Sequence, residues 1–165
     1  MQTDPIELLT EDHRQIRRLF QEFRDAGDDT TRKKQLVDQM IEALTVHTYI
    51  ENECMYPETR RLLPDLDDEV LESYEEHHVA DVLCLELAAM SPDHDHFDAK
   101  TTVLMELVEH HIGEEEQEWF PKVRSGLSTE QLQTIGQRLA EMKETAPRKP
   151  TAPRALKKAL DAVRA

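Results

Sequence analysis

The sequence predicts an all-α protein: a four-helix bundle followed by an additional C-terminal helix and a Pro-rich basic tail. Helix-forming residues dominate a chain that has only four glycines, and no segment alternates like a β-strand. Apolar residues recur at steps of three and four along several long segments. Proline or glycine stands at the ends of those segments, where helices commonly stop.

The first predicted helix covers residues 4–26. Thr3 or Asp4 can accept hydrogen bonds from its first free N–H groups, and Pro5 has the backbone angle of a first helical position. One polar residue, a histidine, interrupts the apolar stripe on its inner face. The stripe consists of Ile6, Leu9, His13, Ile16, Phe20 and Phe23.

Three further long helices are expected over residues 29–57, 66–90 and 96–118. Pro57 should end or kink the first of these, because proline lacks an N–H and its ring crowds the preceding turn. A short helical continuation beyond Pro57 is possible. Pro121 stands in the same relation to the last of the three, so the chain reads as two similar helical hairpins.

The bundle is expected to occupy residues 1–126. A capping-box pattern that starts at Ser128 predicts an additional helix within residues 127–144, packed on or beside the bundle. Residues 145–165 contain three prolines and carry six basic side chains against one acidic side chain. They form a basic tail that can end in a short helix over residues 154–165 and is open to an unknown protein partner.

Composition excludes several classes of protein. The formal net charge of −15 argues against general binding to nucleic acid or to an anionic membrane surface. No apolar run approaches the roughly 18 residues of a membrane span, and the N-terminus lacks the pattern of a secretory signal. Two cysteines do not make a disulfide framework. A soluble, cytoplasmic protein is therefore expected.

The strongest feature of the sequence is a repeat at an offset of 64 residues. Each half carries one histidine, then a His-x-x-x-Glu pair, then an aromatic residue followed by proline. An acidic residue precedes the first histidine in both halves, as Asp12 and as Glu76. The other paired positions are His13 and His77, His47 and His111, Glu51 and Glu115, Tyr56-Pro57 and Phe120-Pro121, and Arg60 and Arg124.

This spacing predicts a metal centre. Residues four apart lie on one face of a helix, so His47 and Glu51 can reach one point inside the bundle, where the equivalent pair and the two single histidines meet them. Six such groups are costly to bury without a partner, and imidazole and carboxylate are ligands for transition metals. The two-fold repeat indicates two ions with bridging glutamates. The N/O donor set without cysteine favours iron or manganese over structural zinc.

The sequence resembles the haemerythrin-like (HHE cation-binding) domain family over roughly residues 6–124. The resemblance is carried by the segments EDHRQI, HTYIENECMYP, YEEHHVADVL and HHIGEEEQEWFP. It implies an up-down-up-down bundle and two non-haem iron ions, oxo- or hydroxo-bridged. It also implies work with a small ligand, namely dioxygen, nitric oxide or peroxide, in sensing, scavenging or oxidative-stress defence. The expected ligands are His13, His47, His77 and His111 as terminal groups and Glu51 and Glu115 as bridges.

The chain departs from the oxygen-carrying members of that family, which use a His-x-x-x-His pair on the third helix. Here Ser73 stands four residues before His77 and Asp81 stands four residues after it. One histidine ligand is missing unless Asp81, Tyr74 or His78 replaces it. A centre with an extra open position suits nitric oxide binding or peroxide turnover better than oxygen carriage. If the protein is an enzyme, it is expected to be a di-iron oxidoreductase that consumes one of those two molecules.

Some assignments stay open at this level. His77 competes with His78, which the apolar stripe of its helix would place inward, and His111 competes with His110, although the His-x-x-x-Glu spacing selects His111. Asp81 either joins the centre or is a solvated acid. Packing roles are expected for the aromatic side chains, and an acidic outer face for several glutamates. These residues are Tyr56, Tyr74, Trp119 and Phe120, and Glu114, Glu116 and Glu118.

Two other functions fit the same sequence. The chain could store or deliver iron without reacting with a small ligand. It could also be an interaction protein in which a metal only holds the bundle closed, with the basic tail as the working part.

Overall fold

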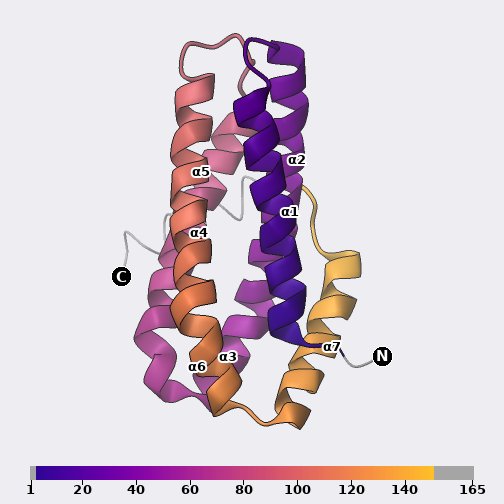
Figure 1. The fold of residues 1–165 in the computed structure, drawn as a ribbon, viewed down its shortest axis with the longest axis vertical. Coiled ribbons are helices and arrows are strands. Elements are labelled where there is room, and N and C mark those ends of the chain that lie inside the picture. Colours follow the sequence, from indigo (N-terminus) through magenta and orange to yellow (C-terminus); the bar gives the residue numbers. More distant parts are fainter. Residues whose placement is uncertain (1–2, 151–165) are drawn as a thin grey trace.

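The computed structural model describes residues 3–150 and shows a bundle of four long helices with a fifth along one flank (Figure 1). In Figure 1 the chain runs up, down, up and down, and α7 then lies beside the lower half of α1. This arrangement confirms the predicted bundle with an additional helix. The long helices are α1 (Pro5–Asp25), α2 (Thr30–Ile50), α4 (Asp67–Ala88), α5 (Phe97–Glu114) and α7 (Thr129–Thr145). The helix predicted over residues 154–165 lies outside the described residues.

The helix ends follow the capping residues of the sequence. Asp4 Oδ1 accepts hydrogen bonds from two N–H groups in the first turn of α1, at 2.8 and 3.1 Å. Asp29 accepts one hydrogen bond in the first turn of α2, from the Arg32 N–H at 2.9 Å, and Ser128 forms the predicted capping box with Gln131. Gly27, at φ +58°, makes the left-handed turn that lets α2 fold back on α1.

The two helices that carry the His-x-x-x-Glu pairs each contain a π-helical turn, which the sequence did not predict. α2 continues through η1 (Glu51–Met55) into α3 (Tyr56–Leu62), and α5 continues through η3 (Glu115–Trp119) into α6 (Phe120–Gly126). A proline follows each π turn by two residues. The helix widens around the proline instead of ending there, so the continuation beyond Pro57 is real and stops at Leu62. A short 3₁₀ turn, η2 (Pro64–Leu66), then leads into α4.

The core is divided into two apolar clusters. One fills the end of the bundle nearest the α1–α2 and α4–α5 connections and includes Phe20, Leu36 and Leu104. The other fills the opposite end and includes Leu9 and Val123. Between them lies a polar layer in which every residue is at most 6% exposed. It consists of His13, His47, Glu51, His77, His111 and Glu115.

α7 packs against α1, α2 and η1 through Leu132, Ile135 and Leu139, which belong to the second cluster. Gly136 permits close contact with the N-terminus, because a Cβ atom there would lie 1.9 Å from the carbonyl oxygen of Thr3. α7 is therefore part of the packed core and not a loosely attached helix. Within residues 3–150, no helix combines the length and hydropathy that a membrane crossing requires.

Candidate metal centre

Glu51 stands between histidines from the two halves of the chain. Its Oε2 atom lies 3.3 Å from His47 Nε2, one turn earlier on the same helix, and 3.2 Å from His77 Nε2 on α4. A single carboxylate oxygen therefore faces imidazoles of both hairpins. This is the position that a bridging ligand requires.

Glu115 occupies the equivalent position in the second half and uses both of its oxygens. Glu115 Oε2 lies 3.2 Å from His13 Nε2, and Glu115 Oε1 lies 3.3 Å from His111 Nε2. The π turn that begins at each glutamate places the two carboxylates at the same height in the bundle. The layer thus combines residues of α1, α2, α4 and α5.

The donor atoms form two groups that share Glu51, and within each group all donors lie within 4.8 Å of one another. Histidine nitrogens bind transition metals at about 2.0–2.1 Å, which places neighbouring ligands of one ion roughly 3 Å apart. The Nε2 atoms of His77 and His111 are 3.0 Å apart. Those of His13 and His47 are 3.2 Å apart. Each group is already spaced to surround a cation.

Two of the histidines are oriented by the acidic residues that precede His13 and His77 in the repeat. Asp12 Oδ2 lies 3.3 Å from His47 Nδ1, and Glu76 Oε1 lies 3.0 Å from His111 Nδ1. A ring N–H that donates to a carboxylate at Nδ1 leaves the Nε2 lone pair directed at the centre.

The other two histidines have partners at the next pair of repeat positions. Asn52 Oδ1 accepts from His77 Nδ1 at 2.8 Å, and Glu116 Oε1 accepts from His13 Nδ1 at 2.9 Å. Glu116 also pairs with Arg17 at 2.9 Å. The expectation that Glu116 belongs to an acidic outer face was therefore wrong. The 64-residue offset between positions 52 and 116 was the signal in the sequence that could have indicated this role.

Tyr56 reaches the middle of the layer, where the sequence suggested only packing. Its hydroxyl donates to Glu115 Oε1 at 2.7 Å and lies 3.1 Å from His77 Nε2. Complete burial, with the nearby carboxylates, raises the pKa of Tyr56 well above its usual value, so the phenol keeps its proton. Its repeat equivalent, Phe120, stacks on His13 with the ring planes 6° apart. The Tyr56 hydroxyl therefore has no counterpart in the other half of the centre.

In the deprotonated state that metal binding requires, several nitrogen and oxygen atoms of the layer face one another with no hydrogen between them. When every Nδ1 donates outward, each Nε2 presents a lone pair to another Nε2 or to a carboxylate oxygen. Glu51 Oε1 and Glu115 Oε2 are buried and receive no hydrogen bond from any described residue. Lone pairs facing one another in a buried site are costly. A bound cation would remove this repulsion, so the donor set fits a metal.

Without a metal, the two glutamates differ in protonation. Burial, together with the negative charge of Glu115, raises the pKa of Glu51 to about 8. Burial also acts on Glu115, but attraction to His111 and His13 outweighs it and holds the pKa of Glu115 well below its usual value. Burial opposes the charging of His111, yet Glu115 and Glu76 raise the pKa of His111 well above 6.5.

The metal-free protein is accordingly expected to lose stability as the pH rises from about 4.5 to about 8. Over this interval folded Glu51 retains a proton that the unfolded chain has released, so folding binds a proton that becomes scarcer with pH. The raised pKa of His111 acts in the same direction above 6.5. Urea unfolding of chelator-treated protein at several pH values measures this slope. Glu51→Gln should flatten it, and an unfolding free energy that rises with pH in the wild type would contradict the prediction.

The remaining predicted residues lie outside the two donor groups. His78 is half-buried and His110 is exposed, so the structure buries His77 and His111 rather than their neighbours. Asp81 is half-buried and belongs to neither group. Tyr74 has a packing role: its ring contacts Tyr56, and its hydroxyl donates to the carbonyl of residue 52 at 3.2 Å. The structure therefore places no seventh predicted residue at the centre.

Comparisons of the sequence and of the fold with known proteins point to the same family. The family model described as Hemerythrin HHE cation binding domain matches residues 4–123. A crystal structure of a hemerythrin HHE cation binding domain-containing protein from Mycobacterium kansasii superposes with a TM-score of 0.73 at 20% identity, over 86% of each chain. At that identity the likeness shows the fold.

Two curated relatives are each 28% identical to this chain. One is a DNA nickase of Nostoc sp. (strain PCC 7120), matched over 77% of this chain and 35% of that protein. The other is an uncharacterized hemerythrin-like protein of Schizosaccharomyces pombe, matched over 74% of this chain and 61% of that protein. The chain thus spans about a third of the first relative and about three fifths of the second.

Proposed function

Because the chain belongs to the Hemerythrin HHE cation binding domain family, we propose that its bundle holds two iron ions and uses them to bind or react with dioxygen, nitric oxide or peroxide. The observation that carries this proposal is the pair of donor groups that share Glu51. The proposed terminal ligands are His13, His47, His77 and His111, and the proposed bridges are Glu51 and Glu115.

The protein's own contribution is orientation and exclusion of water. When bound, iron supplies an open coordination position and one-electron chemistry. Asp12, Glu76, Asn52 and Glu116 hold the four imidazole rings so that each Nε2 faces inward. The apolar clusters above and below the layer limit access of solvent.

A small cavity supports a small ligand over iron storage alone. It has a volume of about 10 Å³ and borders His47, His77 and His111 on the side of the first apolar cluster. The rest of its lining is mainly aliphatic: Leu44, Ala80, Leu107, Val108 and Ile112. A space of this size is at the lower limit for one water-sized molecule and excludes an organic substrate.

Metal analysis combined with an optical spectrum tests the proposal. Iron near two per chain, with absorption that changes on addition of peroxide, azide or nitric oxide, is the expected result. Labile metal with no spectral response would favour storage or delivery. An activity that depends on the basic tail and survives removal of the metal would favour an interaction protein.

Tyr56→Phe is expected to keep the iron and to change its chemistry. All six proposed ligands remain, and phenylalanine already occupies the equivalent position 120. The lost hydroxyl donates to Glu115 at 2.7 Å, so the optical spectrum should shift and the reaction with peroxide should change by roughly tenfold or more. Tyr74→Phe is the matched control, since its hydroxyl bonds to a backbone carbonyl outside the centre. Wild-type spectra and rates in Tyr56→Phe would contradict the prediction.

We assign no nucleic-acid partner to the bundle. Nickase activity belongs to the cyanobacterial relative, and this chain matches only 35% of that protein. The net charge of −15 opposes contact with a phosphate backbone.

A further inference from the structure

The 64-residue repeat creates two equivalent grooves beside the polar layer. One groove is covered by α7, and the other is lined by carboxylates. The first groove runs along α1 and η1, and α7 covers it with Leu132, Ile135 and Leu139. The side chains beneath α7 are apolar. They include Leu8, Leu9, Ile50, Cys54 and Met55. On this side the layer is closed by a hydrophobic lid that belongs to the same chain.

The second groove runs along α4 and η3 and contains a cavity of about 90 Å³. Six carboxylates line it: Glu69, Glu72, Glu76, Glu114, Glu115 and Glu118. Two of the proposed ligands, His111 and Glu115, line the same cavity from within. The cavity therefore extends from an acidic surface to the proposed centre.

The contrast is specific to individual repeat positions. Where the first half has apolar side chains under α7, the second half has glutamates at an offset of 64. The pairs are Leu8 and Glu72, Ile50 and Glu114, and Cys54 and Glu118. An ordinary solvated surface mixes both signs of charge. Here the carboxylates that line the described cavity outnumber the basic side chains paired with them, which are Lys122 on Glu69, His110 on Glu114 and His111 on Glu76. The excess of negative charge attracts cations.

The outer end of this groove holds a third group of possible metal ligands. Donor atoms of Glu76, His110 and Glu114 lie within 4.8 Å of one another, and His110 Nε2 is 3.1 Å from Glu114 Oε1. The same Glu76 carboxylate lies 3.0 Å from His111 Nδ1. Glu76 therefore belongs to the surface group and also contacts His111, one of the proposed ligands of the centre.

A buried donor marks the same cavity as a place for a polar guest. Trp119 lines the cavity and is 5% exposed, yet its indole N–H has no acceptor among the described residues. Buried donors of this kind normally find a partner. Glu115, which lines the same cavity and is 2% exposed, likewise has an oxygen, Oε2, that receives no hydrogen bond from the described residues.

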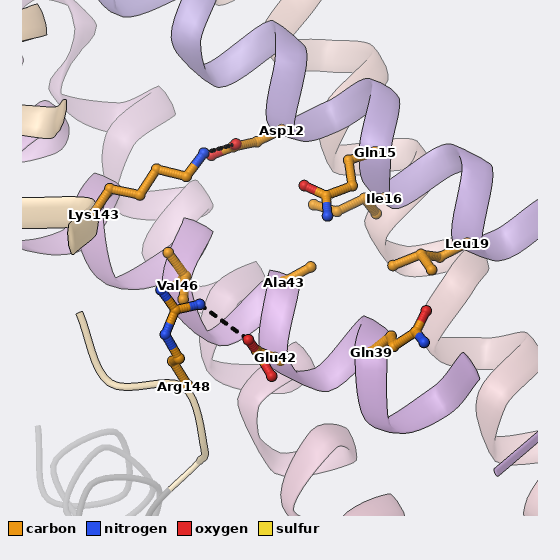
Figure 2. A pocket seen from close by; sticks show the side chains of 10 residues that line it. All are labelled: Asp12, Gln15, Ile16, Leu19, Gln39, Glu42, Ala43, Val46, Lys143 and Arg148. Atoms are coloured by element: carbon orange, nitrogen blue, oxygen red, sulfur yellow. Dashed lines mark hydrogen bonds and ion pairs between the residues drawn. The ribbon is translucent and has the colours of Figure 1, made fainter. Parts of the chain in front are cut away.

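A cavity of about 240 Å³ on another face of the bundle does not offer the same route. Figure 2 shows it between α1 and α2, bordered by Lys143 and by Arg148. Its charges are balanced, because Lys143 pairs with Asp12 and Arg148 pairs with Glu42 at 3.0 Å. None of its lining residues is a proposed ligand. Asp12, its one link to the centre through His47, is already occupied by Lys143.

We propose that divalent iron reaches the centre through the acidic groove between α4 and η3, where Glu76, His110 and Glu114 first hold the ion. From there the ion moves inward through the cavity, which the proposed ligands His111 and Glu115 also line. The route rests on the proposed function, since it supplies the same centre. The carboxylates raise the local concentration of cations at the mouth, and this effect weakens as salt screens the charges.

The rate of iron loading tests the route. The full-length metal-free chain is mixed with ferrous iron without oxygen, and uptake is followed by competition with a chromogenic chelator. Glu72→Gln/Glu118→Gln and His110→Ala/Glu114→Gln should load roughly 3- to 10-fold more slowly at low ionic strength, with the difference closing at high salt. Asp93→Asn/Asp95→Asn is the control, with two carboxylates removed at the exposed α4–α5 connection.

The final iron content separates the two proposals. The expected result is wild-type iron content in every variant, with slow loading only in the two groove variants. Wild-type loading rates in both groove variants, at full iron content, would overturn the route and leave the centre intact. Equal slowing in the control would assign the effect to net charge and also overturn the route. A wild-type chain that takes up no iron would overturn the proposed centre, and the route with it.

Discussion

Glu115→Ala is expected to lose most of the bound iron, with an affinity lower by more than about 100-fold. The two oxygens of Glu115 face His13 and His111, which belong to different donor groups, so one substitution removes a ligand from both proposed ions. Loss of the carboxylate also leaves buried imidazoles without a charge partner. Metal analysis after gel filtration in a weak chelator measures the effect. His47→Ala removes a ligand from one group and is expected to act in the same direction.

Two histidines serve as matched controls for that result. His78 is next to His77 but lies outside both donor groups, and His94 is exposed in the connection between α4 and α5. Alanine at either position should leave the iron content at the wild-type level. If these variants lost the metal while Glu115→Ala kept it, the proposed ligand set would be wrong.

Removal of the metal is expected to lower the melting temperature by roughly 8–16 °C. A ligand present at about 1,000 times its Kd stabilises the folded state by about 4 kcal/mol, and each kcal/mol corresponds to about 2–4 °C in a domain of this size. Thermal unfolding with and without a strong chelator measures the shift.

The same chelator experiment on Glu115→Ala provides its control. That variant should already melt near the temperature of the chelator-treated wild type and should respond little to chelator. A wild-type melting temperature that does not change when the metal is removed would show that the cation contributes nothing to the fold.

The sequence predicted which six side chains form the buried polar layer because two independent periodicities agree on them. The four-residue step places His47 with Glu51 on one helical face, and the 64-residue offset finds the same pair in the second hairpin. A bundle made of two such hairpins brings these faces together. The choice of His77 over its neighbour came from the repeat alone, and the structure buries His77 at 2% exposure.

The side chains that contact the histidines of the polar layer were harder to predict from the sequence, for physical reasons. Asn52 and Glu116 differ in chemistry and lie beside a ligand position, so helical periodicity places them at the edge of the inner face. The hydroxyl of Tyr56 reaches the centre only because a π turn precedes it and changes the direction of the side chain. Single-sequence patterns do not indicate π turns, although the proline two residues after each of them is the visible trace.

The cover formed by α7 depends on packing between distant segments. Leu8 and Ile50 read as ordinary members of apolar stripes, and their equivalents Glu72 and Glu114 read as ordinary surface acids. The difference acquires meaning only when α7 is seen to lie on one half of the bundle and to leave the other half uncovered.

The polar layer between the two apolar clusters also determines how the hairpins align. Purely apolar helix faces tolerate a shift of one helix along another, since a leucine can take the packing position of another leucine one turn away. A shift of one turn, about 5.4 Å, would bring Glu51 against aliphatic side chains and strand both carboxylates in hydrocarbon. We expect the polar layer to fix the register of the two hairpins during folding, because misaligned pairings would bury unpaired carboxylates. This effect does not require a bound ion.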